Sequence, residues 1–355
     1  MDLSSNQFTQ LPASIGQLKK LKKMILKRNK LTQLPPEISQ LKNLEELDLS
    51  RNQLAQLPPV IGALKQIKKI ILESNRLTQL PEEIGKLKNL EELKLRFNQL
   101  SALPATMGQL KKLAILELPH NKFTQTPSVI GKLSGLVSLV LHNNQLTQLP
   151  SSIGNLKNLK DLALEGNQLM ELPSTIASLK NLEMINLDNN RLVRLPSTIG
   201  NLSNLKVLRL DNNQLSQLPP SIDQLKNLEA LYLHKNRLTQ LPASIGALKN
   251  LKTMKLSWNR FTQLPLSIGQ LTHLQILRLE NTQLTQLPAS VGQLKNLKEL
   301  FVGNRVMALP KTVVQLKNLE ILAVGNGLAQ LPSNIGQLSK LKKLYIVGSR
   351  LSQLP

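Results

Sequence analysis

Five titratable residues that recur at intervals of 23 have the most chemistry to offer, and they are His142, Glu165, Asp188, Asp211 and His234. If each interval leads to the next strand of a parallel sheet, neighbouring side chains lie about 5 Å apart. Three adjacent carboxylates repel at that spacing, so at least one pKa is expected to rise unless a cation binds between them. Imidazole with carboxylate could hold Zn²⁺, and carboxylates alone could hold Ca²⁺.

This column has two other interpretations, because any repeat generates columns. It could be an electronegative strip that faces a basic partner, or a solvated face without a ligand. His120 lies diagonally beside His142 and could join a metal site. Zn²⁺ or Ca²⁺ therefore stays a hypothesis, and the sequence indicates no other cofactor.

A second set of side chains has the composition of a protein-binding surface. Five of the eight aromatic residues fall at exposed positions of segments with the pattern LxxLxLxxN, and three cations accompany them. Aromatic and arginine side chains are the usual anchors of protein interfaces. Pairing between strands to stabilise the sheet is the alternative. The predicted partner-binding residues are Phe97, Arg209, Tyr232, Lys255, Trp258, Arg278, Phe301 and Tyr345.

A repeat positions both sets of residues. Sixteen prolines from Pro12 to Pro355 recur every 23 residues, apart from two steps of 22 between Pro288 and Pro332. Such a period indicates one supersecondary unit stacked on copies of itself. The continuous repetition predicts a single elongated domain, residues 1–355, with about 16 repeats, of which the first and last are incomplete.

One repeat, residues 44–66 (LEELDLSRNQLAQLPPVIGALKQ), shows the expected local structure. The alternation around Leu47 and Leu49 predicts a short strand with a buried leucine face. Asn52 recurs at this phase in successive repeats, and its amide could satisfy backbone groups of neighbouring turns as a ladder. The few residues after Pro58 leave room only for a short helix or 3₁₀ turn.

The unit LPxxIGxLKNLxxLxLxxNxLxxLP, present in residues 80–104, resembles the leucine-rich repeat (LRR), and its 23-residue form resembles the bacterial subclass of leptospiral LRR proteins. A similar return arm occurs in the Ras-scaffold type of intracellular LRR. The resemblance implies an α/β solenoid (horseshoe) with a parallel β-sheet on the concave face and short helices or 3₁₀ turns on the convex face. Thr282, which replaces the ladder asparagine, and the two 22-residue units predict altered local geometry near the C-terminus.

The chain is strongly basic, with 45 Lys and Arg against 22 Asp and Glu. Many lysines recur just before the predicted strand, from Lys42 to Lys317, as a framework ladder. The exposed positions of the concave face are nearly balanced, with about twelve basic and eleven acidic residues, so a nucleic-acid groove is not expected. Solubility explains the lysines most simply, and adhesion of this lysine rim to anionic polysaccharide or membrane is the alternative.

Several classes of function find no support in the sequence. There is no apolar run of about 18 residues that would predict an integral membrane segment, no visible signal peptide, and no cysteine for thiol chemistry. Phosphate-binding and hydrolase motifs are missing, so an enzyme is not expected. The ends lack polar caps, which favours a fragment of a longer protein or an end-to-end oligomer.

The sequence therefore predicts a non-enzymatic module that binds a protein partner through its concave face. The leptospiral resemblance implies a secreted or cell-surface protein that contacts a host surface or matrix protein, although the residues themselves leave the localisation unknown. An intracellular scaffold for a small GTPase is the alternative binding function.

Overall fold

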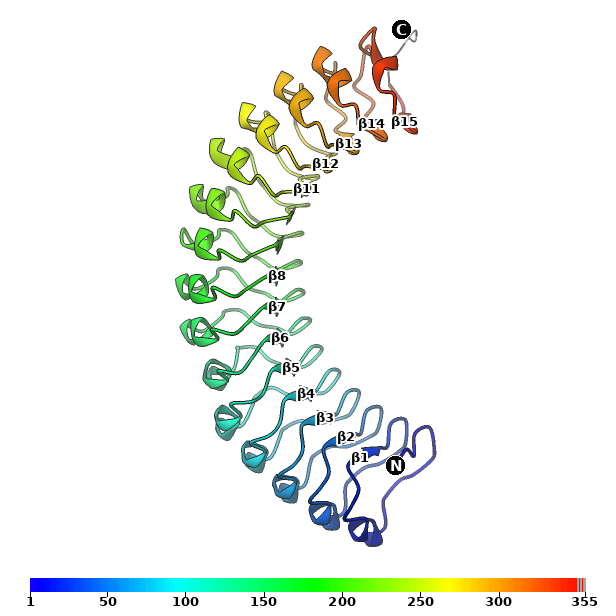
Figure 1. Cartoon of the computed structure of the whole chain (residues 1–355), viewed down its shortest axis with the longest axis vertical. Coiled ribbons are helices and arrows are strands. Elements are labelled where there is room, and N and C mark those ends of the chain that lie inside the picture. The colour runs from blue at the N-terminus through cyan, green and yellow to red at the C-terminus, as the bar shows by residue number, and fades with distance from the viewer. Residues whose placement is uncertain (350, 352, 354–355) are drawn as a thin grey trace. The chain divides into compact units, whose positions relative to one another are not determined.

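The computed structural model describes residues 1–349, 351 and 353. The chain forms two compact units, the N-terminal unit Met1–Leu169 and the C-terminal unit Met170–Pro355 (Figure 1). That residues 1–355 make a single solenoid stays a prediction, and Pro355, the last proline of the period, lies outside the described residues. No helix within the described part of the chain is long and apolar enough to cross a membrane.

Short strands and 3₁₀ helices (η) alternate through the N-terminal unit, and each strand pairs in parallel with its neighbours in chain order. The strands lie on the inner side of the unit and the 3₁₀ helices on the outer side, as expected (Figure 1). The elements are η1 (Ala13–Gln17), β1 (Lys23–Ile25), η2 (Pro36–Gln40), β2 (Glu46–Asp48), η3 (Pro59–Ala63), β3 (Lys69–Ile71), η4 (Glu82–Lys86), β4 (Glu92–Lys94), η5 (Ala105–Gln109), β5 (Ile115–Glu117), η6 (Ser128–Lys132), β6 (Ser138–Val140), η7 (Ser151–Asn155) and β7 (Asp161–Ala163).

The C-terminal unit has the same alternation and the same parallel order of strands. Its elements are η8 (Ser174–Ser178), β8 (Met184–Asn186), η9 (Ile199–Asn201), β9 (Val207–Arg209), η10 (Pro220–Gln224), β10 (Ala230–Tyr232), η11 (Ala243–Ala247), β11 (Thr253–Lys255), η12 (Leu266–Gln270), β12 (Ile276–Leu279), η13 (Ala289–Gln293), β13 (Glu299–Val302), η14 (Lys311–Gln315), β14 (Ile321–Val324), η15 (Ile335–Gln337) and β15 (Lys343–Ile346). From β12 on the strands lengthen from three residues to four, and parallel bridges join Gln286 to Ala308 and Ala308 to Gln330. The expected change of geometry near the C-terminus is thus confirmed.

The core of each unit consists of leucine and isoleucine side chains at fixed places in the repeat. Leu47 and Leu49 of one repeat, and Ile61 of the 3₁₀ helix that follows them, are fully buried. Most returns form 3₁₀ helices of five residues, slightly longer than the three- to four-residue runs that are common for this helix. Gly62 is needed because a Cβ atom there would lie 2.7 Å from the backbone oxygen of Glu83 in the next turn.

The predicted asparagine ladder is present. The side chain of Asn75 donates to the backbone oxygens of Leu49 and Leu72, both at 3.0 Å, and accepts from the backbone N–H of Leu54 at 3.0 Å. Each such amide ties its own repeat to the preceding one, because its partners lie in both. Thr282 keeps only a bond within its own repeat, to a backbone oxygen 2.9 Å away.

One further ladder was not predicted from the sequence, and the predicted lysine ladder has backbone partners that the sequence did not indicate. The asparagine of most LKNL segments bonds to the preceding repeat, as Asn89 does by donating to the backbone oxygen of Lys65 at 3.0 Å. Several framework lysines donate to the last carbonyl of the next 3₁₀ helix, as Lys111 does to Lys132 at 2.7 Å. Cationic donors at a helix C-terminus satisfy carbonyls that have no partner within the helix. The regular spacing of these lysines therefore has a structural cause.

Candidate functional site

The last residues of the three-residue strands β8–β11, and the matching positions of β12–β15, form one row across the inner face of the C-terminal unit. The strand register places these residues beside one another in chain order. Most of the predicted partner-binding residues meet here. The row, called the cation–aromatic row below, reads Asn186, Arg209, Tyr232, Lys255, Arg278, Phe301, Ala323 and Tyr345.

Cations of the row stack on its aromatic rings. The guanidinium of Arg209 lies 4.7 Å from the ring centre of Tyr232, and the ammonium of Lys255 lies 5.0 Å from the same centre. The guanidinium of Arg278 lies 4.0 Å from the ring centre of Phe301. Such contacts lie within the range of cation–π attraction. They hold long side chains in place before a partner arrives, which lowers the entropy cost of binding.

An apolar row runs beside the cation–aromatic row, on the first residues of the strands. Its half-buried side chains leave part of their surface to solvent on the inner face. An apolar strip next to aromatic and arginine side chains is the composition of a protein interface core. This apolar row occupies the first residues of β8–β12, which are Met184, Val207, Ala230 and Ile276 together with Thr253, whose hydroxyl is its one polar group.

Phe97 and Trp258 do not lie on strands, which corrects the expectation that all five exposed aromatics stand at strand positions. Both directly precede a ladder asparagine and have a left-handed backbone, with φ of 53° and 57°. Their side chains are 45% and 54% exposed. A bulky residue in this conformation is costly compared with glycine or asparagine. The repeat imposes this conformation at the same phase on other residues as well, such as Arg51 and Lys235, so the exposed rings rather than the backbone indicate a binding role.

In the N-terminal unit Phe97 belongs to a stack of rings. The ring of His120 lies parallel to it at 4.2 Å between centres, and His142 meets His120 edge-on at 5.4 Å. The guanidinium of Arg96 lies 4.7 Å from the ring centre of Phe97. Burial lowers the pKa of both histidines, and the charge of Arg96 acts in the same direction, which favours the neutral imidazoles. The stack was missed from the sequence, although Phe97 and His120 are 23 residues apart and so share one phase.

The residues of the titratable column are partly engaged by the protein itself. In the N-terminal unit, Nδ1 of His142 lies 4.0 Å from Oε1 of Glu165. In the C-terminal unit, Asp188 is buried and forms an ion pair of 2.6 Å with Arg209. Its other oxygen accepts the backbone N–H of Asp211 at 2.7 Å.

The carboxylate of Asp211 in turn accepts the backbone N–H of His234 at 2.7 Å. Burial raises the pKa of Asp211, and the neighbouring charge of Asp188 raises it further, as the sequence argument expected for crowded carboxylates. Over residues 1–349, 351 and 353, no group of three or more histidine, aspartate or glutamate side chains is arranged to hold a metal ion. The metal hypothesis for this column stays a prediction.

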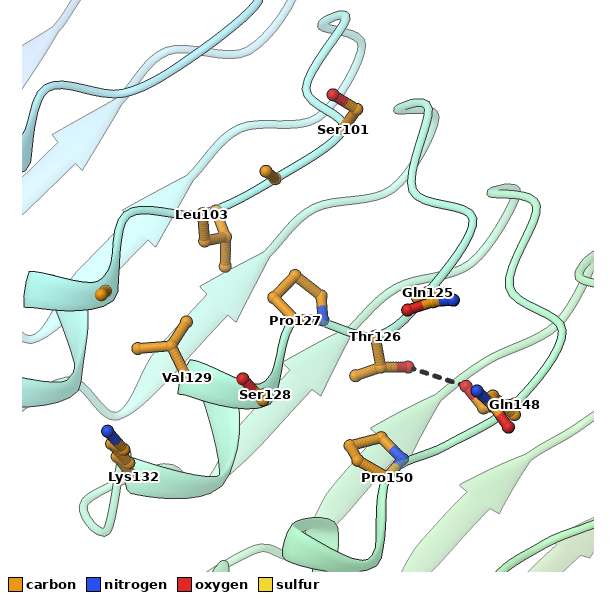
Figure 2. A pocket seen from close by; sticks show the side chains of 12 residues that line it. Ser101, Leu103, Gln125, Thr126, Pro127, Ser128, Val129, Lys132, Gln148 and Pro150 are labelled. Carbon is orange, nitrogen blue, oxygen red and sulfur yellow. Dashed lines mark hydrogen bonds between the residues drawn. The ribbon is translucent and has the colours of Figure 1, made fainter.

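One hollow lies away from these residues, on the segments that lead into the 3₁₀ helices of the N-terminal unit. It has a volume of about 470 Å³ and is lined by residues from Ser101 to Pro150 (Figure 2). Thr126, which replaces the usual leucine, donates to the backbone oxygen of Gln148 at 3.3 Å. A similar hollow of about 540 Å³ occurs at the same phase beside Pro265. The hollows therefore follow from the repeat, and the lining of the first offers Lys132 but no carboxylate or imidazole for acid–base chemistry.

Family models agree with this architecture. A leucine-rich repeat region matches residues 60–145, 129–213, 196–275 and 243–346, and a leucine rich repeat model matches residues 1–54. The chain belongs to the leucine-rich repeat family. A comparison with curated protein sequences found no match.

Solved structures of LRR proteins are similar over nearly the whole chain. An LRR protein of Leptospira interrogans has 40% identity and a TM-score of 0.87, covering 97% of this chain and 94% of its own. The plant peptide hormone receptor RGFR1, solved in complex with RGF2, has 28% identity and a TM-score of 0.81, covering 98% of this chain and 63% of its own.

An internalin of Listeria monocytogenes, at 20% identity and a TM-score of 0.73, shares the fold, covering 92% of this chain and 87% of its own. The 40% identity to the Leptospira interrogans protein confirms the predicted resemblance to leptospiral LRR proteins. The leucine-rich repeat family and the neighbours at 28% and 40% identity support a coarse role as a protein-interaction module.

Proposed function

We propose that the chain binds a protein ligand through the inner face of the C-terminal unit, with the cation–aromatic row and the exposed ring of Trp258 as the main contacts. The observation that carries this proposal is the strand register, which brings Arg209, Tyr232, Lys255, Arg278 and Phe301 side by side. Aromatic and arginine anchors beside an apolar strip are typical of binding hot spots. RGFR1, which is solved with RGF2 bound, gives a precedent for a ligand on a similar scaffold.

The ligand we propose is a host cell-surface or extracellular-matrix protein, met by a secreted or surface-exposed chain. The similarity to an LRR protein of Leptospira interrogans supports this proposal. The proposed binding needs no metal or cofactor at this surface.

Adhesion through the lysine rim has weaker support. Several ammonium groups of that rim already donate to backbone carbonyls, among them Lys180 at 2.7 Å from Asn201 and Lys249 at 3.0 Å from Gln270. Exposed charges of this kind attract anionic surfaces mainly at low salt. Binding through the row relies on packing instead and should survive moderate salt.

The test is affinity capture from matrix and host-cell surface extracts on the immobilised full chain in moderate salt. Wild type is compared with Tyr232→Ala/Trp258→Ala, and with a control in the N-terminal unit, Lys94→Ala/Glu117→Ala. A protein retained by wild type and control but lost by the aromatic variant supports the proposal. Equal retention by all three, with release as salt rises, overturns it and points to lysine-rim adhesion.

A further inference from the structure

Two imidazole nitrogens face one amide group on the N-terminal unit. Nε2 of His120 lies 3.2 Å from Nδ2 of Asn143, and Nδ1 of His142 lies 2.8 Å from the same atom. An amide nitrogen donates hydrogen bonds but does not accept them, so both imidazole nitrogens direct lone pairs toward one point. Two convergent imidazole lone pairs are the beginning of a metal site.

The amide sits in a place that the neighbouring repeat leaves open for it. Gly166, at the same phase as Asn143, has φ of +68°, and a Cβ atom there would collide with Oδ1 of Asn143. The missing side chain of Gly166 thus leaves room for the carboxamide of Asn143 between the two repeats. Oε1 of Glu165, 4.0 Å from Nδ1 of His142, adds an oxygen donor at the edge of the site.

The rings are also held in orientation. His120 stacks on Phe97 with an angle of 16° between the ring planes, and His142 stands at 85° to His120. Groups that fix the orientation of an imidazole contribute to metal affinity, because the ligand loses less freedom on binding. The exposed ring of Phe97 thereby gains a positioning role that the sequence did not suggest.

We propose that His120 and His142 form a two-imidazole site for a late divalent transition metal, with Cu²⁺ the ion that it binds most tightly, and that the carboxamide of Asn143 occupies the site in the metal-free protein. Imidazole favours this class of ion, and Cu²⁺ heads the affinity order for nitrogen ligands. Metal–nitrogen bonds of about 2.0–2.1 Å are shorter than the present contacts, so the amide must leave and the half-buried rings must close in. Water or Glu165 completes the coordination.

This site lies wholly within the N-terminal unit and differs from the column predicted at the outset. It shares His142 and Glu165 with that column, makes His120 a principal ligand where the sequence offered it only as a possible addition, and does not use Asp188, Asp211 or His234. It is also independent of the proposed protein-binding surface, so either proposal can fail alone.

The test is calorimetric titration of the full chain with CuCl₂, with nitrogen hyperfine structure from electron paramagnetic resonance as the second readout. The chain has four histidines, which supply a matched control. Wild type and His234→Ala/His273→Ala should bind one equivalent with two imidazole nitrogens. The affinity of His120→Ala/His142→Ala for Cu²⁺ should fall by more than the roughly 10–100-fold that removal of an outer-shell partner costs. Its circular dichroism spectrum should stay unchanged.

Equal Cu²⁺ binding by all three chains, or a loss confined to the His234/His273 variant, would overturn the proposal. Asn143→Gly tests the occupant separately, because glycine keeps the left-handed backbone at φ 53° while removing the amide. Tighter binding by this variant supports displacement of the carboxamide. Weaker binding would show that the amide is not the group displaced.

Discussion

The two units share one framework and present different inner faces. In the N-terminal unit the first residues of β1–β4 form an alternating charge ladder, with ion pairs of 2.9 Å between Lys23 and Glu46 and 2.8 Å between Lys69 and Glu92. Lys94 continues this ladder by pairing with Glu92 and with Glu117, at 3.0 and 3.1 Å. In the C-terminal unit the first residues of β8–β12 form the apolar row, and charged side chains lie in the cation–aromatic row and among its partners, where Arg209 pairs with Asp188 at 2.6 Å and Arg278 with Glu299 at 3.3 Å.

The difference shows which inner face can gain free energy by binding a partner. Side chains of the charge ladder satisfy one another, so a partner that covers them must desolvate paired charges for little gain. Aromatic rings and half-exposed aliphatic groups gain free energy when a partner removes them from water. The identical strand register in both units therefore does not make their faces equivalent.

Removal of the aromatic anchors is expected to have the largest effect on this contrast. Tyr232→Ala/Trp258→Ala should weaken ligand binding by more than about 2 kcal/mol, roughly 30-fold in Kd, because hot-spot rings carry most of the interface energy. Biolayer interferometry with the captured ligand measures the loss. Lys94→Ala/Glu117→Ala should change Kd less than about twofold, and an equal loss there would erase the distinction between the faces.

Breaking the asparagine ladder should affect both units alike, because it belongs to the framework. Asn213→Leu removes bonds to the backbone oxygens of Leu187 and Leu210 and from the N–H of Leu192. We expect a loss of about 1–3 kcal/mol in the free energy of unfolding, since buried backbone groups stay unpaired. Asn98→Leu is the counterpart in the N-terminal unit, and denaturant unfolding of both variants without loss would contradict the ladder assignment.

Removing one carboxylate of the charge ladder should lower the free energy of unfolding of the N-terminal unit slightly, and this loss should depend on pH. Burial pushes the pKa of Glu92 upward, but hydrogen bonds from Lys69 and Lys94 outweigh it and hold the pKa below its usual value. The ionised form is thus favoured by folding, and its contribution is lost as pH falls through the folded pKa, below 4.5. Glu92→Gln should cost at most about 1 kcal/mol at neutral pH, with a difference from wild type that shrinks in acid.

Asp211 should respond to pH in the opposite sense, with the smallest effect. Its raised pKa means that the folded state prefers the protonated form, so stability present below the unfolded value of 3.8 is lost as pH rises through the folded pKa. Asp211→Asn keeps an oxygen that can accept the His234 N–H and removes the charge. Thermal unfolding should show a stabilised variant at pH 7 and no difference below pH 3.8, whereas a destabilised variant at pH 7 would contradict this electrostatic account.

The sequence predicts those features that recur at one phase of the repeat. The buried leucine positions, the 3₁₀ returns and the Asn75-type ladder follow because each is fixed by contacts with the next identical unit. The row from Arg209 to Tyr345 was selected by residue type, but its continuity needed the strand register. The left-handed backbone of Phe97 and Trp258 could not be read from residue type, since neither is common in that conformation.

The contacts of Asn143 show a second limit. Its position depends on Gly166 in the next repeat, on the ring of His120 in the preceding repeat and on the ring of His142 in its own repeat. Such contacts between unlike residues carry no periodic signal. They appear only when side-chain positions are known.

Site-specific photo-crosslinking tests the contrast between the two faces most directly. A benzophenone amino acid is placed at Ala323, on the cation–aromatic row, or at Ala163, the matching row position of the N-terminal unit. Both native residues are half-buried alanines, so the two probes perturb the fold equally. The account predicts crosslinks to the captured ligand from position 323 and none from position 163. Crosslinks from position 163 alone, or equally from both, would contradict it.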